Sequence, residues 1–163
     1  MFKRANIKRI SPAATLLCGL WCGAEAGAQY GQNTPAANPV YPAYQVKADG
    51  IAQPLAPPGD ALRGRALLIA RDPANCILCH GLSDPAVRFA GNLAPPLDGA
   101  GSRLSIAQLR LRVADSSRIN PETIMPSYYR TEGLRAVAAA YQGRPVLTAQ
   151  QVEDVVVYLS TLR

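Results

Sequence analysis

Two cysteines and a histidine fall within five residues of one another, in the run Cys76-Ile77-Leu78-Cys79-His80. This C-x-x-C-H spacing is the attachment signature of c-type haem, because two thiols on one turn can add to the two vinyl groups while the next imidazole reaches the iron. His80 is also the only histidine of the chain. We therefore expect one haem c, attached through Cys76 and Cys79, with His80 as an iron ligand.

Three other sites use the same residue types. A structural zinc ion requires four ligands, and the sequence has no second C-x-x-C or H-x-H cluster to complete the set. A thioredoxin-like redox pair would lie in a β-α-β setting, which the sequence lacks. A small disulfide loop followed by an incidental histidine stays open as an alternative, but it would leave the long irregular stretches of the chain without a purpose. Haem attachment is the interpretation that we favour.

The second axial ligand has one strong candidate. Because the chain has no second histidine, bis-histidine ligation within one chain is excluded. Met125 precedes Pro126, which restricts Met125 to extended backbone and stiffens the loop that presents it. Thioether ligation raises the reduction potential and suits electron transfer, so we predict that Met125 binds the iron. The alternatives are Met125 as a flexible core residue and Lys47 as a nitrogen ligand.

The first 28 residues resemble a secretory signal peptide. A basic head, an apolar stretch at 13–23 and the small residues Ala26-Gly27-Ala28 predict cleavage after Ala28 and export to the periplasm. The apolar stretch is too short to span a bilayer, and large residues precede Cys18 and Cys22, which argues against lipidation. Half of the formal net charge of +6 belongs to this segment. An uncleaved N-terminus or a short membrane anchor is the alternative.

The rest of the chain divides into a tail and a domain. A length of 163 residues allows one domain with a core and not two of full size. Residues 29–58 carry six prolines and few large aliphatic side chains, which predicts an N-terminal tail or linker. Residues 59–163 form the predicted domain, whose long loops at 81–104 and 115–130 need something to wrap around. We expect neither a membrane nor a nucleic acid as a partner.

Helical periodicity dominates the predicted domain. Capping boxes formed by Ser105 with Gln108 and by Thr148 with Gln151 predict the starts of two helices, and the Ala-rich stretch 131–141 predicts another. The last helix carries an apolar stripe at helical spacing, namely Val152, Val155, Val156, Leu159 and Leu162. An earlier helix is expected between Gly59 and Pro73, with one face of Leu62, Ala66 and Ile69 and a neighbouring face of Gly64 and Leu68. No segment alternates with period two for long, so the fold class is all-α.

Further stretches resemble those of known cytochromes. The run Ala94-Pro95-Pro96-Leu97 resembles the loop of class I cytochromes c whose proline carbonyl accepts the N–H of the haem histidine, and Pro95 is the matching residue. A rigid turn without that role is the alternative. The chain from Gly64 to Arg163 resembles, more specifically, the monohaem SoxX subunits of the sulfur-oxidation system. The stretches that carry this resemblance are IMPSYY, YQGRP and TAQQVEDVVVYLSTL.

The resemblance implies a class I cytochrome c-like fold, with helices packed around a covalently attached haem. It also implies a heterodimer with a SoxA-like haem subunit, which oxidatively joins thiosulfate to a cysteine of a carrier protein as an L-cysteine S-thiosulfotransferase. In that family the substrate is converted at the SoxA haem, and the X subunit passes the electrons on, here to a soluble cytochrome c. A free-standing class I cytochrome c and a periplasmic thiol oxidoreductase using Cys76 and Cys79 are the alternatives.

The residues themselves agree with a redox role and not with an enzyme acting alone. Outside the predicted signal peptide the chain has no second cysteine pair, no spare histidine and no carboxylate cluster from which to build a catalytic site. Iron held by both His80 and Met125 would have no free position for a substrate.

Overall fold

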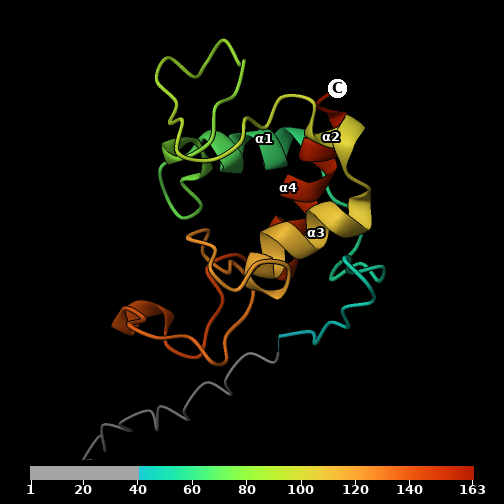
Figure 1. Cartoon of the computed structure of the whole chain (residues 1–163), viewed down its shortest axis with the longest axis vertical. Helices are drawn as coiled ribbons and strands as arrows, with labels where there is room; N and C mark the ends of the chain where they lie inside the picture. Colours follow the sequence, from blue (N-terminus) through green and yellow to red (C-terminus); the bar gives the residue numbers. More distant parts are fainter. Residues whose placement is uncertain (1–40) are drawn as a thin grey trace, which may run out of the picture. The chain divides into compact units, whose positions relative to one another are not determined.

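Residues 41–163 are described by the structure, a computed structural model, and the regular elements of this part are helices joined by long loops (Figure 1). The elements in chain order are α1 (Ala61–Ile69), η1 (Cys76–Leu78), α2 (Ala100–Arg103), α3 (Ile106–Asp115), η2 (Ser116–Arg118), η3 (Ala139–Tyr141) and α4 (Ala149–Thr161). Within the described range there are isolated β-bridges but no strand, so the predicted all-α class is confirmed. The predicted signal peptide and residues 29–40 of the predicted tail lie outside the described residues.

Helix α4 is the element on which the other helices pack (Figure 1). It begins at the predicted capping box, because the Thr148 hydroxyl accepts from Gln151 N and the Gln151 side chain accepts from Thr148 N. Its buried side carries most of the predicted apolar stripe, namely Val152, Val155, Val156 and Leu159. Helices α1, α2 and α3 each contact α4. None of the helices between residues 41 and 163 is long and apolar enough to cross a membrane.

Helix α3 is joined to α4 by a buried ion pair. The helix begins at the second predicted capping box, formed by Ser105 and Gln108. From its inner side, Arg110 donates through Nε and Nη2 to the two carboxylate oxygens of Glu153 on α4, at 2.7 and 2.9 Å. Both side chains are buried, so each charge depends on the other for its stabilisation.

The same ion pair holds part of the segment that the sequence predicted as a tail. Ile51, which is fully buried, accepts a hydrogen bond from Arg110 Nη1 through its carbonyl at 2.6 Å. The N–H of Leu55 donates to Glu153 Oε1 at 2.9 Å, and the Leu55 side chain is buried. Residues 51–55 therefore pack as part of the domain. The ion pair also satisfies the hydrogen-bonding groups of the backbone at Ile51 and Leu55, so this segment can be buried although it has few large aliphatic side chains.

Helix α1 crosses α4 at very short range, and Gly64 makes this approach possible. A Cβ atom on Gly64 would overlap the backbone carbonyl of Asp154. The sequence predicted two neighbouring apolar faces for this helix. The face of Gly64 and Leu68 is buried, whereas Leu62 on the other face is 80% exposed. The helix ends at Ile69, several residues before Pro73.

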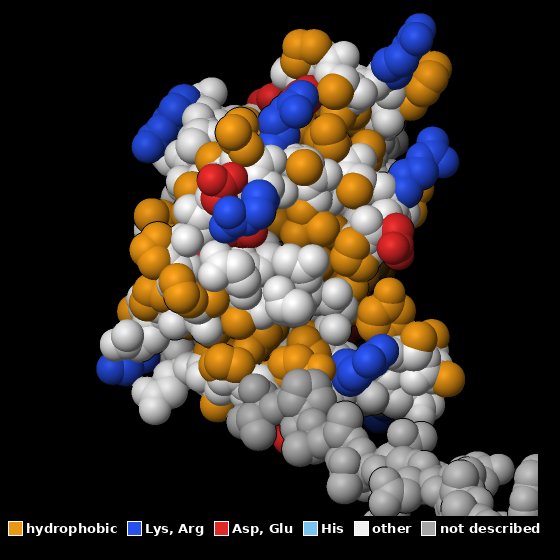
Figure 2. Space-filling view, turned by 180° about the vertical axis from the view of Figure 1, so that it is seen from behind, with side chains coloured by type: hydrophobic (Ala, Val, Ile, Leu, Met, Phe, Trp, Pro, Cys, Tyr) orange, Lys and Arg blue, Asp and Glu red, His pale blue; other side chains and the backbone are white. Residues whose placement is uncertain are grey.

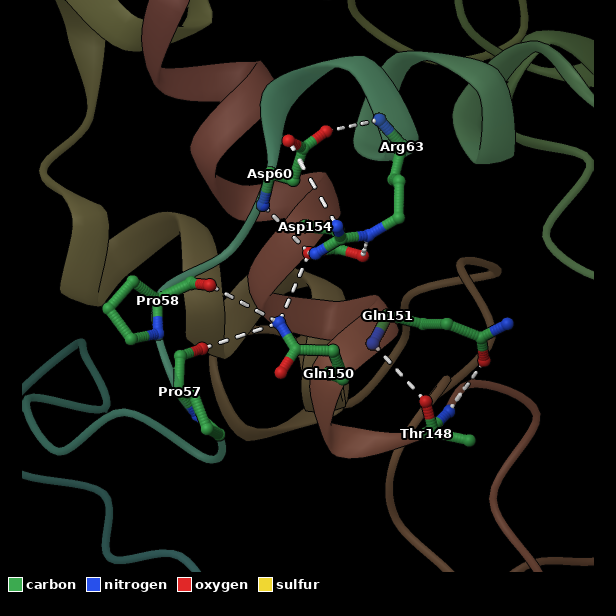
Figure 3. Close-up of polar contacts among 8 residues, drawn as sticks. All are labelled: Pro57, Pro58, Asp60, Arg63, Thr148, Gln150, Gln151 and Asp154. Atoms are coloured by element: carbon green, nitrogen blue, oxygen red, sulfur yellow. Dashed lines mark hydrogen bonds and ion pairs between the residues drawn. The ribbon is translucent and has the colours of Figure 1, made fainter.

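A network of polar contacts fixes the start of α1 against α4 (Figure 3). Asp154 accepts hydrogen bonds at 2.8 Å from Arg63 Nε, Arg63 Nη2 and Asp60 N. The Asp60 side chain in turn accepts from Arg63 N and so caps the helix. The Arg63 guanidinium lowers the pKa of the Asp154 carboxyl, since it stabilises the charged form. Gln150 of α4 extends this network, because its Nε2 donates to Asp154 and to the carbonyls of Pro57 and Pro58.

The predicted helix at 131–141 is wrong. Only Ala139–Tyr141 forms a single 3-10 turn there, and the backbone enters the left-handed region at Gly133 and Ala136. No side chain between residues 131 and 141 is fully buried. Alanine-rich composition favours a helix, but a segment this short needs an apolar face packed against the core to be stable in water.

Basic side chains are spread over the surface. On the face drawn in Figure 2, lysine and arginine side chains stand apart from one another, with apolar and uncharged side chains between them. That face of the described residues therefore offers no continuous basic strip of the kind that binds a nucleic-acid backbone.

Replacing Gly64 by alanine should strongly destabilise the protein, because the added methyl group meets the α4 backbone, which cannot move away. We expect Gly64→Ala to lower the free energy of unfolding by about 3 kcal/mol or more. Guanidinium unfolding of the haem-loaded protein measures the change. Leu62→Ala, on the exposed side of the same helix, is the control and should stay within about 0.5 kcal/mol of the wild type. Equal effects of the two substitutions would contradict this account of the crossing.

Candidate functional site

The C-x-x-C-H motif forms one tight turn. The 3-10 turn η1 is entered at Asn75 with a φ of 50°, and the N–H groups of Cys79 and His80 both donate to the carbonyl of Cys76, at 3.2 and 3.1 Å. The two cysteines form no disulfide with each other, and both are half-buried. Burial raises the pKa of the Cys76 thiol to about 11. The turn presents both thiols and the imidazole to the same cavity.

The imidazole of His80 is oriented by the predicted proline loop. His80 Nδ1 lies 2.7 Å from the carbonyl oxygen of Pro95. A carbonyl only accepts hydrogen bonds, so Nδ1 carries a proton, and in the neutral imidazole Nε2 then keeps its lone pair. This is the arrangement that fixes the tautomer and ring orientation of a metal-binding histidine.

Backbone contacts bring the proline loop back along the motif. The N–H of Ala94 donates to the carbonyl of Cys79 at 2.9 Å, and the N–H of Gly91 donates to the carbonyl of Ile77 at 2.8 Å. A Cβ atom on Gly91 would overlap the carbonyl of Leu78, so the return of the loop requires glycine at this position.

Arg103 at the end of α2 supports the same loop, and the sequence did not predict it. Its guanidinium donates to the carbonyls of Asp98 and Pro96, at 2.7 and 2.9 Å. These contacts fix the backbone directly after Pro95. An arginine at this position carries no sequence signal for such a role, because the contact is made with backbone atoms several residues away.

The cavity beside the motif has a volume of about 660 Å³ and mostly apolar walls. Cys76, Cys79 and His80 line one side, together with Pro95. The apolar side chains that line it come from α1, α3, α4 and the loops, and include Leu68, Leu97, Leu104, Leu109, Val113, Ile119, Leu147, Val155 and Leu159. Its size lies in the range of pockets that enclose cofactors.

Met125 lines this cavity as well, from the loop that follows α3. Its N–H donates to Thr123 Oγ1 at 3.2 Å, and its side chain is half-buried against the core. The structure thus brings all five predicted site residues to one cavity: Cys76, Cys79, His80, Pro95 and Met125. Lys47, the alternative ligand, is exposed and does not line it.

Tyr128 is a further residue of this site that the sequence did not single out. It lines the cavity, and its hydroxyl donates to the carbonyl of Ala74 at 2.7 Å, directly before the motif. Burial and the neighbouring Cys76 raise the pKa of Tyr128. The phenol therefore remains a donor and ties the start of the motif to the segment that follows Met125. Because Tyr129 is adjacent and also buried, the sequence alone does not tell which of the two tyrosines lines the cavity.

The loop after His80 is anchored to the helices by Asp84. The Arg65 guanidinium of α1 donates to both Asp84 oxygens at 2.6 Å, and the hydroxyl of Tyr158 on α4 contacts Asp84 Oδ2 at 3.4 Å. The bidentate pair with Arg65, followed by the bond from Ala86 N, lowers the pKa of Asp84 to about 2.

Residues 61–163 match the family model described as Cytochrome c. The chain belongs to the cytochrome c family. A chain of the crystal structure of SoxXA from P. pantotrophus resembles this cytochrome with a TM-score of 0.68 and 35% sequence identity, over 73% of this chain and 93% of that chain. The predicted SoxX-like character is thus confirmed, and so is the predicted cofactor, a covalently attached haem c.

A curated relative of different description shares part of the sequence. The D-inositol 3-phosphate glycosyltransferase of Rhodococcus opacus (strain B4) is 36% identical over 110 residues, which are 61% of this chain and 24% of that protein. The chain spans about a quarter of the length of this relative. The match transfers no glycosyltransferase activity to this cytochrome.

The residues of the cavity fit a haem c. Two thiols stand on one turn, as thioether attachment requires, and the imidazole beside them keeps Nε2 available because Nδ1 is bonded to Pro95. The remaining walls are apolar, which suits the faces of a porphyrin.

The Arg65 and Asp84 pair should make the stability of the protein depend on acidity. Because the folded state holds the pKa of Asp84 near 2, below its ordinary 3.8, the ion pair contributes fully above about pH 4 and is lost as pH falls through 2. We expect wild type to be more stable than Asp84→Asn at neutral pH and the difference to vanish near pH 2. Denaturant unfolding at a series of pH values measures it. Glu132→Gln, at an exposed position, is the control and should follow the wild type throughout.

Proposed function

We propose that this cytochrome works in the periplasm as the electron-transferring subunit of a complex with a SoxA-like haem protein. The observation that carries the proposal is the similarity to the SoxXA structure over 93% of the matched chain. The complex would oxidatively conjugate thiosulfate to a cysteine of a carrier protein, and a soluble cytochrome c would accept the electrons. The predicted signal peptide at residues 1–28 supports the location.

Each site residue has a defined part in this role. The Cys76 and Cys79 thiols would hold the haem by thioether bonds, and His80 Nε2 and the Met125 sulfur would bind its iron. The haem supplies a one-electron iron couple. Pro95 keeps the His80 proton on Nδ1 and strengthens Nε2 as a donor. The apolar walls exclude water and favour a high reduction potential.

This assignment leaves the substrate chemistry to the partner. With His80 and Met125 both bound to the iron, the site could exchange an electron, but it would have to release one of these ligands before it could bind thiosulfate. A covalently attached haem also consumes both thiols, which rules out their use as a dithiol redox pair.

An apolar rim at the mouth of the cavity is where we expect the partner to contact this subunit. Leu93 and Ile124 both line the cavity, yet they are 68% and 73% exposed. Electron exchange requires the two haems to be close, so the partner must cover the edge of this site. Exposed apolar side chains beside a redox centre suit an interface, and a stable one would bury more than about 1,000 Å².

Replacement of Met125 tests the axial ligand. Met125→Ala should lose the charge-transfer band between sulfur and ferric iron and should lower the reduction potential, while covalent attachment of the haem persists. Met125→His should lower the potential further, because imidazole donates more strongly than a thioether. Absorption spectra and redox titration of the purified holoprotein measure both. An unchanged band in Met125→Ala would assign the position to another group.

Reconstitution tests the function. The isolated chain should show no turnover of thiosulfate and carrier protein, whereas the pair with a SoxA-like subunit should be active. Leu93→Lys should weaken association with that subunit without altering the haem spectrum. Leu62→Lys is the matched control, since Leu62 is equally apolar and exposed but does not line the cavity. Full turnover by this chain alone, or no association with a SoxA-like subunit, would favour a free-standing cytochrome c.

A further inference from the structure

Asp115, the last residue of α3, is fully buried and stands outside the cavity. Its Oδ1 accepts hydrogen bonds from Ser117 Oγ at 2.5 Å and from Ser127 Oγ at 2.7 Å. Its Oδ2 accepts from the Tyr44 hydroxyl at 3.3 Å and lies 3.5 Å from Arg130 Nε. Side chains from the segment before α1, from the turn directly after α3 and from residues 127–130 therefore converge on one carboxylate.

These contacts close the loop that carries Met125. Ser117 lies two residues after Asp115, and Ser127 lies two residues after Met125. One oxygen atom, Asp115 Oδ1, thus joins the start of the loop to its end. Just beyond the loop, the N–H of Tyr129 donates to the carbonyl of Ala114 at 3.0 Å.

The remaining contacts of Asp115 tie this closure to the rest of the domain. Tyr44 belongs to the segment before α1, and burial followed by the Asp115 carboxylate raises the pKa of its hydroxyl to about 12, so it stays a donor. Arg130 supplies the positive charge, as an ion pair without a hydrogen bond. A buried carboxylate is costly unless it is paired and hydrogen-bonded, and here hydroxyl groups provide most of the bonds.

We propose that Asp115 is a positioning residue that holds the Met125 loop in the conformation in which the sulfur can bind the haem iron. It does so by fixing both ends of the loop through Ser117 and Ser127. This inference rests on the proposed ligation of the iron by Met125. Without the closure, the loop would have more conformations available, and the sulfur would spend less time at the iron.

Competition with an external ligand measures this positioning. Imidazole binds ferric haem only when it displaces the methionine, so its affinity reports how firmly Met125 is held. Ser127→Ala should raise the affinity for imidazole about tenfold, which corresponds to about 1.4 kcal/mol and to the loss of one strong hydrogen bond. Asp115→Ala removes the bonds from both serines and should raise the affinity at least as much. The charge-transfer band of the free protein should also weaken.

Two further variants separate positioning from general stability. Glu153→Gln alters another buried carboxylate, which binds Arg110 and Leu55 N and has no contact with the Met125 loop. It should lower the stability of the protein but leave the affinity for imidazole within twofold of wild type. Asp115→Asn keeps an oxygen that can accept from both serines, so it should bind imidazole less tightly than Asp115→Ala does.

The outcomes distinguish the two proposals. If Met125→Ala abolishes the band while Asp115→Ala and Ser127→Ala leave imidazole binding unchanged, Met125 is the ligand and the role of Asp115 is refuted. An equal increase in Glu153→Gln would also refute it, because the effect would then follow from stability alone. If Met125→Ala leaves the band unchanged, both proposals fail. Should Asp115→Ala not fold, Ser127→Ala and Asp115→Asn decide the question.

Discussion

The fold depends on a cavity that the protein does not fill with its own side chains. About 660 Å³ at the meeting point of the helices is lined by aliphatic residues of α1, α3, α4 and the intervening loops. In water such walls would be costly to leave uncovered, so the packing of these elements requires a large apolar group between them. The covalently attached haem is that group. The long loops, which lack regular structure, gain their order by enclosing it.

Local patterns predicted much of this arrangement. The motif at 76–80 and the capping boxes at Ser105 and Thr148 involve residues that are close in the sequence. Their spacing alone was therefore enough to predict the local geometry. Met125 could be predicted as an iron ligand because it is the only methionine after the predicted signal peptide. Pro95 was accessible only through family resemblance, since a backbone carbonyl has no signature of its own.

Long-range polar contacts escaped the sequence analysis. The ion pairs of Arg110 with Glu153 and of Arg65 with Asp84 join residues that only the folded chain brings together. The contacts of Asp115 with Tyr44 and Ser127 do the same. From composition alone, charged residues such as these are expected at the surface. In each of these ion pairs, however, the side chain of the acidic residue is buried. The predicted helix at 131–141 was wrong for the opposite reason. Its helical propensity is local, and no packed surface supports it.

The central place of α4 has a consequence for the order in which the protein can assemble. Helix α1 crosses α4 at Gly64, Leu55 N is bonded to Glu153, and Gly101 N is bonded to the carbonyl of Leu162. Helices α1, α2 and α3 thus each find a packing partner in the C-terminal helix. A chain that emerges with its N-terminus first has no complete core before α4 is available, and its C-x-x-C-H thiols remain accessible until then. The late closure of the domain leaves time for the cysteines to react while the chain is still open.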